Sequence, residues 1–450
     1  MFKTLKNAWK VQDIQNKILF TLLIILLYRL GSAIPVPYVS HALTDSVFNQ
    51  QYGSSILGYL SILSGGAMSQ ATFFALSVSP YIKSSIVIQL LTVAFPDSLG
   101  KLAKDGEEGQ KKIKKYTRWV TIAIALVTAY GYTALLGSGS NGTSWLNSEY
   151  ITWNGMWASN GFEGTINTFV VIASYVAGAC IIMWLAELID AKGIGNGISM
   201  ILFFNIISRG PQLIRGLWTM ITVTFKGKPV IGISLGVLSV VITAAMVLLV
   251  VWVTHSERRI PIQYAKRVVG RKMYGGQGTH LPIKLNMTGV MPIIFASSIV
   301  SVPATIAMFF QGSGFANWVT KWLGPNSWIY VIIYLLLIIA FAYFYILISF
   351  NPVEVANNIK NNGGSVPGIR TGRPTAEYIT KILNRITLIG AFFLIIVAGL
   401  PMIINIVSGG TFQGLAFGGS SLLIVIGVAI ETFRDIEAQI TMRNYKGFLD

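Results

Sequence analysis

The chain has 450 residues, of which 53% are hydrophobic and only 11% are charged. Soluble domains carry roughly 25% charged residues, so this composition excludes an ordinary soluble protein and indicates an integral membrane protein. The net charge of +17 suggests a nucleic-acid-binding protein at first sight, but the basic residues gather in the connections between apolar runs. That distribution is typical of membrane topology.

Apolar runs near twenty residues predict membrane spans, because a helix rising 1.5 Å per residue needs about 20 to cross a ~30 Å core. The first run follows a basic, amphipathic segment, carries Arg29 and shows no small-residue cleavage site, so we read it as a retained span. Arg209, Gly210 and Pro211 interrupt the fifth run. We predict an all-α polytopic protein of ten transmembrane helices, covering 18–34, 71–94, 119–137, 166–189, 198–216, 230–254, 288–310, 328–349, 386–404 and 414–433.

Lysine and arginine set the predicted orientation, because basic connections stay in the cytoplasm. Most of the 34 basic residues lie in connections on the side of the N-terminus, so we expect both termini to be cytoplasmic. The connection 138–165 lacks lysine and arginine and is predicted to be an outer loop. The cluster from Arg209 to Lys228 is an exception to the rule.

The stretch from residue 56 to 91 has an unusual pattern. Its apolar segment 56–63 is too short to cross a bilayer, and Ser64-Gly65-Gly66 joins it to the second span, which has Pro80 in its interior. Non-helical backbone at membrane depth is tolerated only where protein or a water-filled cavity surrounds it. We therefore expect a re-entrant segment inside a protein-lined cavity, followed by a wall helix.

A short sequence repeat relates the two halves of the chain. Val78-Ser79-Pro80-Tyr81-Ile82 lies in the second span, and Val290-Met291-Pro292-Ile293-Ile294 lies in the seventh. In a five-plus-five arrangement these two spans run in opposite directions, as in an inverted repeat with the functional site between its halves.

The spans place no carboxylate at mid-membrane, since Glu187, Asp190 and Glu431 lie near span ends. Ion-coupled transporters usually place acidic or histidine side chains there, so a passive conduit is favoured over a secondary transporter of small solutes. A phosphate-binding GxxxxGK[ST] loop, a nucleophile–base pair and a metal-ligand cluster are all missing from the sequence. We predict neither enzymatic activity nor a cofactor or metal; the secondary transporter remains the alternative, and a membrane scaffold does not explain the hinge.

Backbone breakers recur beside branched apolar residues in four spans. They are Pro80, Gly197, Pro292 and Gly418-Gly419. Each alone is compatible with ordinary packing, but as a set they could form an apolar constriction, which blocks ions by dewetting.

Apart from the basic cluster that begins at Arg209, two basic residues fall within the predicted spans. A charged side chain at the bilayer centre costs about 2.5–3.5 kcal/mol on insertion scales. Arg29 lies toward the outer end of its span, where it could snorkel to the interface. Lys83, one turn after Pro80, is expected to face a polar interior or a gap between helices.

Two connections, 255–285 and 350–380, are longer and more basic than simple turns. Orientation and contact with anionic lipids would explain their charge alone, at about 1 kcal/mol per basic residue. Their length favours docking of a large acidic or nucleic-acid-bearing partner.

Long motifs over essentially the whole chain resemble the SecY family, the channel subunits of the bacterial protein translocon. These motifs are LSGGAMSQATFFALSVSPYIKSSIVIQLLT, YTRW, MWLAELIDAKGIGNGIS, YAKR, THLPIKLNMTGVMPIIFASSI, FNPVEVANNIK, VPGIR and GGSSLLIV. The resemblance implies a protein-conducting channel that passes unfolded secretory proteins and releases hydrophobic segments laterally. It implies two pseudo-symmetric inverted halves around a central pore, residues 18–229 and 230–433, between a cytoplasmic amphipathic segment, 1–17, and a cytoplasmic tail, 434–450.

The resemblance also assigns residue roles. The pore ring would be Val78, Ile82, Ile198, Leu202, Ile294 and Ile424. The plug and its hinge, about 56–66, would comprise Ile56, Leu57, Tyr59, Leu60, Ile62, Leu63, Gly65 and Gly66. Lateral-gate candidates, between the second and third and the seventh and eighth spans, are Ser79, Lys83, Gln89, Ser297 and Ser298. Contacts with a motor or ribosome would come from Arg258, Arg259, Lys266, Arg267 and Arg370.

Partners implied by the resemblance are the SecE and SecG subunits, the SecA ATPase, the ribosome, signal peptides and nascent secretory or membrane proteins. The implied location is the bacterial plasma membrane. The chain departs from the family pattern at Ser77, where glycine is usual, and at Val78 and Leu202, where isoleucine is usual. Ser77 and Lys83 make the expected gate face more polar than the family pattern.

Overall fold

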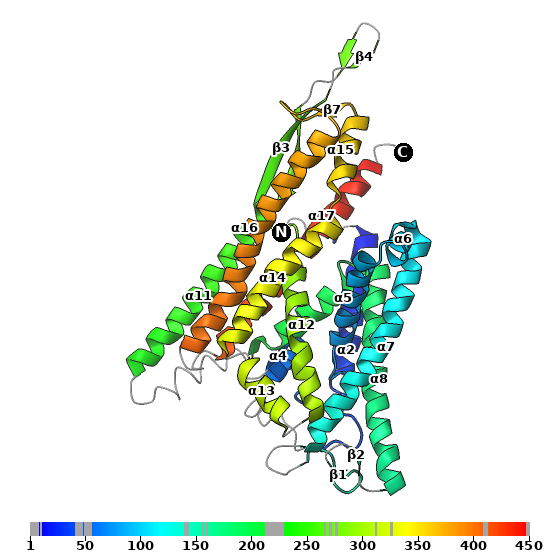
Figure 1. Cartoon of the computed structure of the whole chain (residues 1–450), viewed down its shortest axis with the longest axis vertical. Helices are drawn as coiled ribbons and strands as arrows, with labels where there is room; N and C mark the ends of the chain where they lie inside the picture. The colour runs from blue at the N-terminus through cyan, green and yellow to red at the C-terminus, as the bar shows by residue number, and fades with distance from the viewer. Residues whose placement is uncertain are drawn as a thin grey trace.

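The computed structural model is mainly helical (Figure 1). It describes residues 9, 11–40, 48, 56–138, 144–154, 157–158, 161–211, 229–264, 267–269, 272–274, 278–310, 313–324, 327–407 and 413–446. Seven stretches of helix among these residues are long and apolar enough to cross a membrane. This confirms a polytopic helical protein, while the number ten stays a prediction.

Each predicted span overlaps one helix. These helices are α2 (Gln12–Gly31), α5 (Ser79–Ala94), α7 (Gly106–Ser138), α8 (Gly161–Lys192), α9 (Gly197–Ser208), α11 (Pro229–His255), α12 (Met291–Ala307), α14 (Trp328–Ser349), α16 (Arg373–Val407) and α17 (Gln413–Lys446). Shorter helices are α4 (Ile56–Leu63), α6 (Leu99–Lys104), η2 (Met308–Phe310), α13 (Gly314–Trp322) and α15 (Pro352–Asn361).

The expected helix over 71–94 is wrong in its first part, because α5 begins only at Ser79. Turns occupy residues 64–78, so Pro80 lies in the first helical turn and not in the interior of a span. Proline is favoured there, since the first-turn N–H groups have no partner within the helix and its ring presets φ. Pro292 has the same place in α12, and the capping residues Val78 and Val290 share the αR conformation. The sequence repeat therefore encodes the same helix start twice.

The fifth predicted span, 198–216, is also shorter than expected, because α9 ends at Ser208 and residues 212–228 lie outside the described part. Two side-chain hydrogen bonds fix the start of α9. Asn196 accepts a hydrogen bond from the backbone N–H of Ser199 (3.1 Å), and Asp190 accepts one from the N–H of Gly197 (2.7 Å). A Cβ atom on Gly197 would collide with the backbone of Ala186 in α8, so only glycine permits this close approach.

The helices form two groups (Figure 1). The first group contains α2, α5, α7 and α8. The second contains α11, α14, α16 and α17, and α12 joins it by packing against α14. The groups meet through contacts of α12 with α5 and α4 and of α17 with α9. The main hydrophobic core draws on both groups and lies at this junction.

The connections 255–285 and 350–380 are not simple loops, and the sequence analysis did not predict their strands. Strands β3 (Glu257–Tyr264) and β6 (Gly278–Lys284) pair antiparallel, and β7 (Gly364–Ser365) joins the free edge of β3. Ile260 and Ile262 alternate inward from β3 and pack in a core with Ile379 of α16. The connections thus form one folded unit beyond the helices (Figure 1). Short hairpins are β4 (Arg267–Val269) with β5 (Lys272–Tyr274), and β1 (Trp153–Asn154) with β2 (Trp157–Ala158).

Candidate functional site

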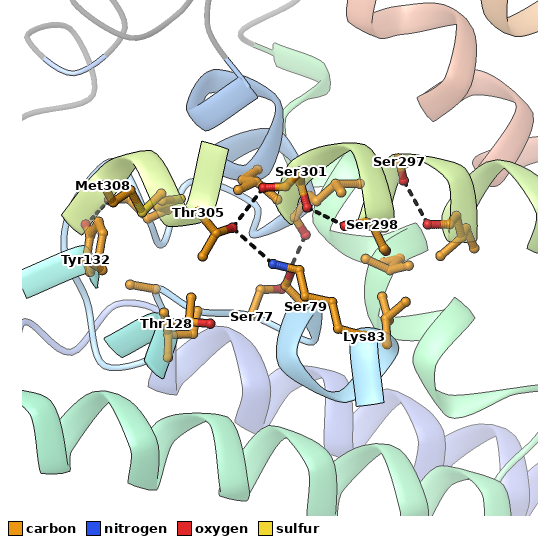
Figure 2. A pocket seen from close by; sticks show the side chains of 18 of the residues that line it. Ser77, Ser79, Lys83, Thr128, Tyr132, Ser297, Ser298, Ser301, Thr305 and Met308 are labelled. Atoms are coloured by element: carbon orange, nitrogen blue, oxygen red, sulfur yellow. Dashed lines mark hydrogen bonds between the residues drawn. The ribbon is translucent and has the colours of Figure 1, made fainter. Parts of the chain in front are cut away.

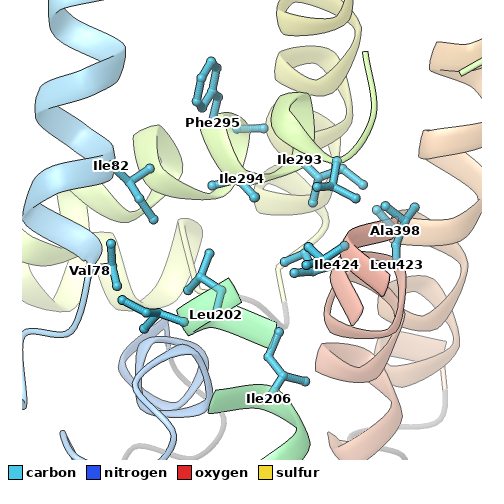
Figure 3. Close-up of a cluster of buried hydrophobic side chains, with 14 of the residues drawn as sticks. Val78, Ile82, Leu202, Ile206, Ile293, Ile294, Phe295, Ala398, Leu423 and Ile424 are labelled. Carbon is cyan, nitrogen blue, oxygen red and sulfur yellow. The ribbon is translucent and has the colours of Figure 1, made fainter. Parts of the chain in front are cut away.

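An aliphatic cluster lies where the two helix groups meet. The structure brings all six residues expected in a ring into one cluster, from the starts of α5, α9 and α12 and from α17. Figure 3 shows five of them: Val78, Ile82, Leu202, Ile294 and Ile424. Five of them are buried in one cluster, and Ile198 packs against it as a half-buried side chain. Ile293 and Leu423 are buried in the same cluster, so the six do not stand apart from their neighbours.

None of the six expected ring residues carries a hydrogen-bonding group in its side chain. Val78, Ile82 and Leu202 face Ile294 and Ile424 across the junction (Figure 3). Branched aliphatic side chains can close a pore without fixing a polar chain in place, because they provide neither donors nor acceptors. The role of these residues as a seal is therefore chemically consistent with their position.

Helix α4 lies directly beside this cluster and contacts α9 and α12. Leu60 and Leu63 pack against the main core, and Leu57 is buried in a second core with α7 and α8. Ile62 is half-buried. The side chains of Ile56 and Tyr59 lie outside the described part of the structure.

Hydrogen bonds from Asn205 and Arg209, at the end of α9, hold the last turn of α4 and the residues after it in place. The guanidinium of Arg209 donates hydrogen bonds to the hydroxyls of Ser61 and Ser69, both at 3.0 Å. The Asn205 amide donates to the Leu63 carbonyl (2.9 Å) and to the Tyr28 hydroxyl (2.8 Å). We call Arg209, Asn205, Ser61 and Ser69 the α4 clasp.

The sequence analysis did not predict the clasp. The one signal in the sequence was Arg209 itself, the first residue of the basic cluster that does not fit the cytoplasmic placement of lysine and arginine. Arg209 is 94% buried, with a relative exposure of 6%. A buried guanidinium must be hydrogen-bonded, and the clasp serines are two of its partners.

Gly65 and Gly66 form the turn that the clasp surrounds. Their φ angles are +66° and +95°, which side-chain-bearing residues rarely adopt. A Cβ on Gly65 would lie 2.9 Å from the guanidinium of Arg29, and one on Gly66 would lie 2.7 Å from that of Arg209. Glycine is thus required both for the turn and for the approach of two arginines. Movement about this hinge stays a prediction.

Ser77 adopts a φ of +52° just before α5, in the left-handed region. The family pattern, in which glycine is usual here, has a direct physical explanation, since glycine occupies this region without a Cβ penalty. The Ser77 hydroxyl lies 3.5 Å from the carbonyl of Leu63, a long hydrogen bond that joins the start of α5 to the end of α4.

A cavity of about 40 Å³ connects the aliphatic cluster to the space between α5 and α12. Its lining includes Leu60, Leu63, Leu202 and Ile424. The gate candidates Ser79 and Lys83 of α5 line it opposite Ser297 and Ser298 of α12 (Figure 2). The Lys83 amine donates a hydrogen bond to the Thr305 hydroxyl of α12 (3.2 Å). Lys83 therefore faces a polar gap between helices, as predicted.

Gln89 is the one gate candidate that does not line the cavity. Its amide donates to the Ser85 hydroxyl one turn earlier on the same helix, at 3.4 Å.

The candidates for partner contact lie on the folded unit of β3, β6 and β7. Arg258, Arg259 and Arg370 are exposed there. Arg259 pairs with Glu257 (2.8 Å), whereas the Arg370 backbone carbonyl accepts a hydrogen bond from Thr375 (2.8 Å). Arg267 lies in β4, with its side chain outside the described part, and Lys266 lies wholly outside it. The described residues contain no group of three or more His, Cys, Asp or Glu side chains suited to hold a metal ion.

Comparisons with known proteins agree with this arrangement. A family model described as SecY matches residues 72–433. The chain is 42% identical to "Protein translocase subunit SecY" of Streptomyces coelicolor and 40% identical to that of Mycobacterium tuberculosis, with complete coverage of both sequences.

Solved structures share the fold. "The structure of a protein conducting channel" matches with a TM-score of 0.64 at 16% identity, covering 94% of this chain and 92% of that one. "Sec61 in the Canine ribosome-channel complex from the endoplasmic reticulum" matches with a TM-score of 0.60 at 15% identity, with the same coverage. At such identities the structures establish the fold, whereas the family model and the full-length relatives establish the family. This chain belongs to the SecY family.

Proposed function

We propose that this chain is the central subunit of a protein-conducting channel. It passes unfolded secretory proteins through the aliphatic cluster and releases hydrophobic segments sideways between α5 and α12. The observation that carries this proposal is the continuity of one site. Four of the six ring residues, the end of α4 and the hydroxyl side chains between α5 and α12 line a single cavity; the four are Ile82, Leu202, Ile294 and Ile424.

The cavity is too small for a passing chain. About 40 Å³ has room for only a few water molecules, which supports a closed state of the channel. Opening requires α4 to leave the cluster and α5 to separate from α12. The name of the full-length relatives, translocase subunit, supports this reading over a transporter of small solutes.

The location that fits the proposal is the bacterial plasma membrane, with both termini and the β3–β6–β7 unit in the cytoplasm. The basic connections support this orientation through the charge rule. The exposed Arg258 and Arg370 would meet a SecA motor or a ribosome, and SecE and SecG would complete the membrane complex. Anionic lipids would contact the same basic face. Because the channel itself is passive in this proposal, the motor, the ribosome or a gradient supplies the energy.

Crosslinking tests the proposal. A photoreactive residue at Ile294 should form an adduct with a secretory chain stalled during export, because Ile294 lies in the constriction through which the chain passes. The matched control is the same residue at Leu336, an exposed position on α14 outside the cavity. Export without an Ile294 adduct would remove the aliphatic cluster from the path.

A further inference from the structure

The hydrogen bond between Lys83 and Thr305 joins the two helices that must separate for a segment to leave sideways. Lys83 is on α5 and is 9% exposed, and Thr305 is on α12 and is 7% exposed. The described residues that line the surrounding cavity include no aspartate or glutamate. The cationic side chain of the gate thus contacts a neutral hydroxyl partner, not a carboxylate, across the gap.

The hydroxyl groups on one face of α12 are placed to accept hydrogen bonds. Ser297, Ser301 and Thr305 repeat every four residues, which places them on one face of the helix. Each donates its own proton to a carbonyl of the preceding turn: Ser297 to Ile294 (2.9 Å), Ser301 to Ser298 (2.7 Å) and Thr305 to Ser301 (2.9 Å). Their remaining lone pairs can only accept, so the Thr305 oxygen receives its hydrogen bond from the Lys83 amine (Figure 2).

This arrangement gives gate opening a chemical consequence. When α12 moves away from α5, the Lys83 amine loses the Thr305 oxygen and needs another acceptor, because a charged group in an apolar medium is costly unless it is paired. A departing segment with a wholly apolar surface offers no acceptor. A segment with a carboxylate offers the strongest replacement, and a segment with a basic residue adds like-charge repulsion.

We propose that Lys83 is a specificity-determining residue of the lateral gate, which favours release of membrane segments that carry an aspartate or glutamate and disfavours those that carry a lysine or arginine. This inference rests on the proposed function, because it concerns segments that leave through the gap between α5 and α12. It adds a selection by charge to the selection by hydrophobicity that an apolar ring alone would impose.

The test uses the full-length chain in its membrane complex and a reporter protein carrying a hydrophobic segment of about 20 residues. The segment has leucine, asparagine, aspartate or lysine at its centre. The inserted fraction of each segment is measured by protease protection, and the aspartate-to-asparagine ratio is the readout. Because the two segments differ in charge but not in size, general damage to the channel cancels in this ratio.

The unaltered channel should insert the aspartate segment more readily, relative to the asparagine segment, than Lys83→Met does. A difference of about threefold to tenfold is expected for one polar pair within a membrane. Lys83→Arg should keep the preference, and Lys83→Gln should lose it. The lysine segment should show the opposite change. Lys321→Met removes an exposed lysine on α13, away from the cavity, and is the matched control that should leave the ratio unchanged.

An equal aspartate-to-asparagine ratio in the unaltered channel, Lys83→Met and Lys83→Gln would overturn the inference, provided that the leucine segment inserts. Failure of the unaltered channel to insert even the leucine segment would instead count against the proposed function. If Lys83→Met does not accumulate, the comparison of Lys83→Gln with Lys83→Arg decides the question, since both keep a hydrogen-bond donor and only one keeps the charge.

Discussion

The guanidinium of Arg209, one residue beyond the end of α9, donates a hydrogen bond of 3.0 Å to the buried hydroxyl of Ser61 in α4. The same guanidinium nitrogen lies 3.0 Å from the hydroxyl of Ser69, so Arg209 joins both sides of the Gly65-Gly66 turn. A single charged side chain thereby holds α4 and the turn after it against the end of α9.

We predict that Arg209→Met loosens the plug. Hydrogen bonds to charged groups contribute about 1.5–3 kcal/mol each, so their loss should shift the closed-to-open ratio by tenfold or more. The measurement is ion leak through purified complexes in vesicles, together with export of a protein with a defective signal sequence. The double variant Ser61→Ala, Ser69→Ala should show the same change from the other side of the contact. A leak equal to that of the unaltered channel in both variants would show that the clasp does not hold the plug.

We predict that asparagine in place of Ile82, Ile294 or Ile424 weakens the seal. Each change adds donors and acceptors to an apolar constriction and so favours wetting. Ion leak should rise and the channel should accept poor signal sequences. Leucine at the same positions is the control, because it keeps the apolar surface and nearly the same volume. Unchanged leak together with unchanged stringency in the asparagine variants would argue against a ring at these residues.

Ser77→Gly should stabilise the closed channel by about 1 kcal/mol. The gain comes from relief of the left-handed backbone, which costs residues other than glycine roughly 1–2 kcal/mol. Loss of the long 3.5 Å hydrogen bond to Leu63 offsets part of this gain. The thermal midpoint of the purified complex is the measurement, with Ser85→Gly, in the interior of helix α5, as a control that should be destabilising. A lower midpoint for Ser77→Gly would show that the hydroxyl matters more than the backbone.

Arg370→Glu should impair motor-driven export, because it reverses a charge on the exposed face proposed to meet SecA. Its side chain is exposed, so the change should leave the stability of the complex nearly unaltered. Export into membrane vesicles with added motor protein and ATP is the measurement. Arg373→Glu reverses a nearby exposed charge that pairs with Glu377 at 3.1 Å, and it serves as the control for a general effect of charge. Normal motor-dependent export by Arg370→Glu would remove its assigned role.

Several features of this fold could be predicted from local sequence. Long apolar runs predict most of the long helices, because a bilayer leaves backbone groups no other partner. The repeated Val-x-Pro pattern correctly marks two equivalent positions. It was expected inside two spans, but it marks the first turn of two helices. Proline starts α5 and α12 and does not interrupt them, since the preceding residues 71–78 are turns. An apolar run alone does not separate turns enclosed by protein from helix exposed to lipid.

Other features depend on contacts between distant residues. The strands of β3, β6 and β7 were not foreseen, because β7 pairs with β3 across about a hundred residues of sequence and its two residues carry no pattern of their own. The α4 clasp was missed for the same reason. Arg209 could be recognised as a break in the fifth predicted span, but its partners and those of Asn205 appear only when the chain between α2 and α5 folds back against them.

By itself, the sequence determined that the chain is a polytopic membrane protein, where most of its helices lie, and which breakers adjoin branched apolar residues. These properties depend on composition and spacing, which are local. Only the tertiary structure decided that the ring residues meet in one cluster, that Arg209 is a structural tie and not an exposed charge, and that Lys83 faces Thr305. A buried charge acquires its role from the partners that surround it, and those partners come from helices far apart in the chain.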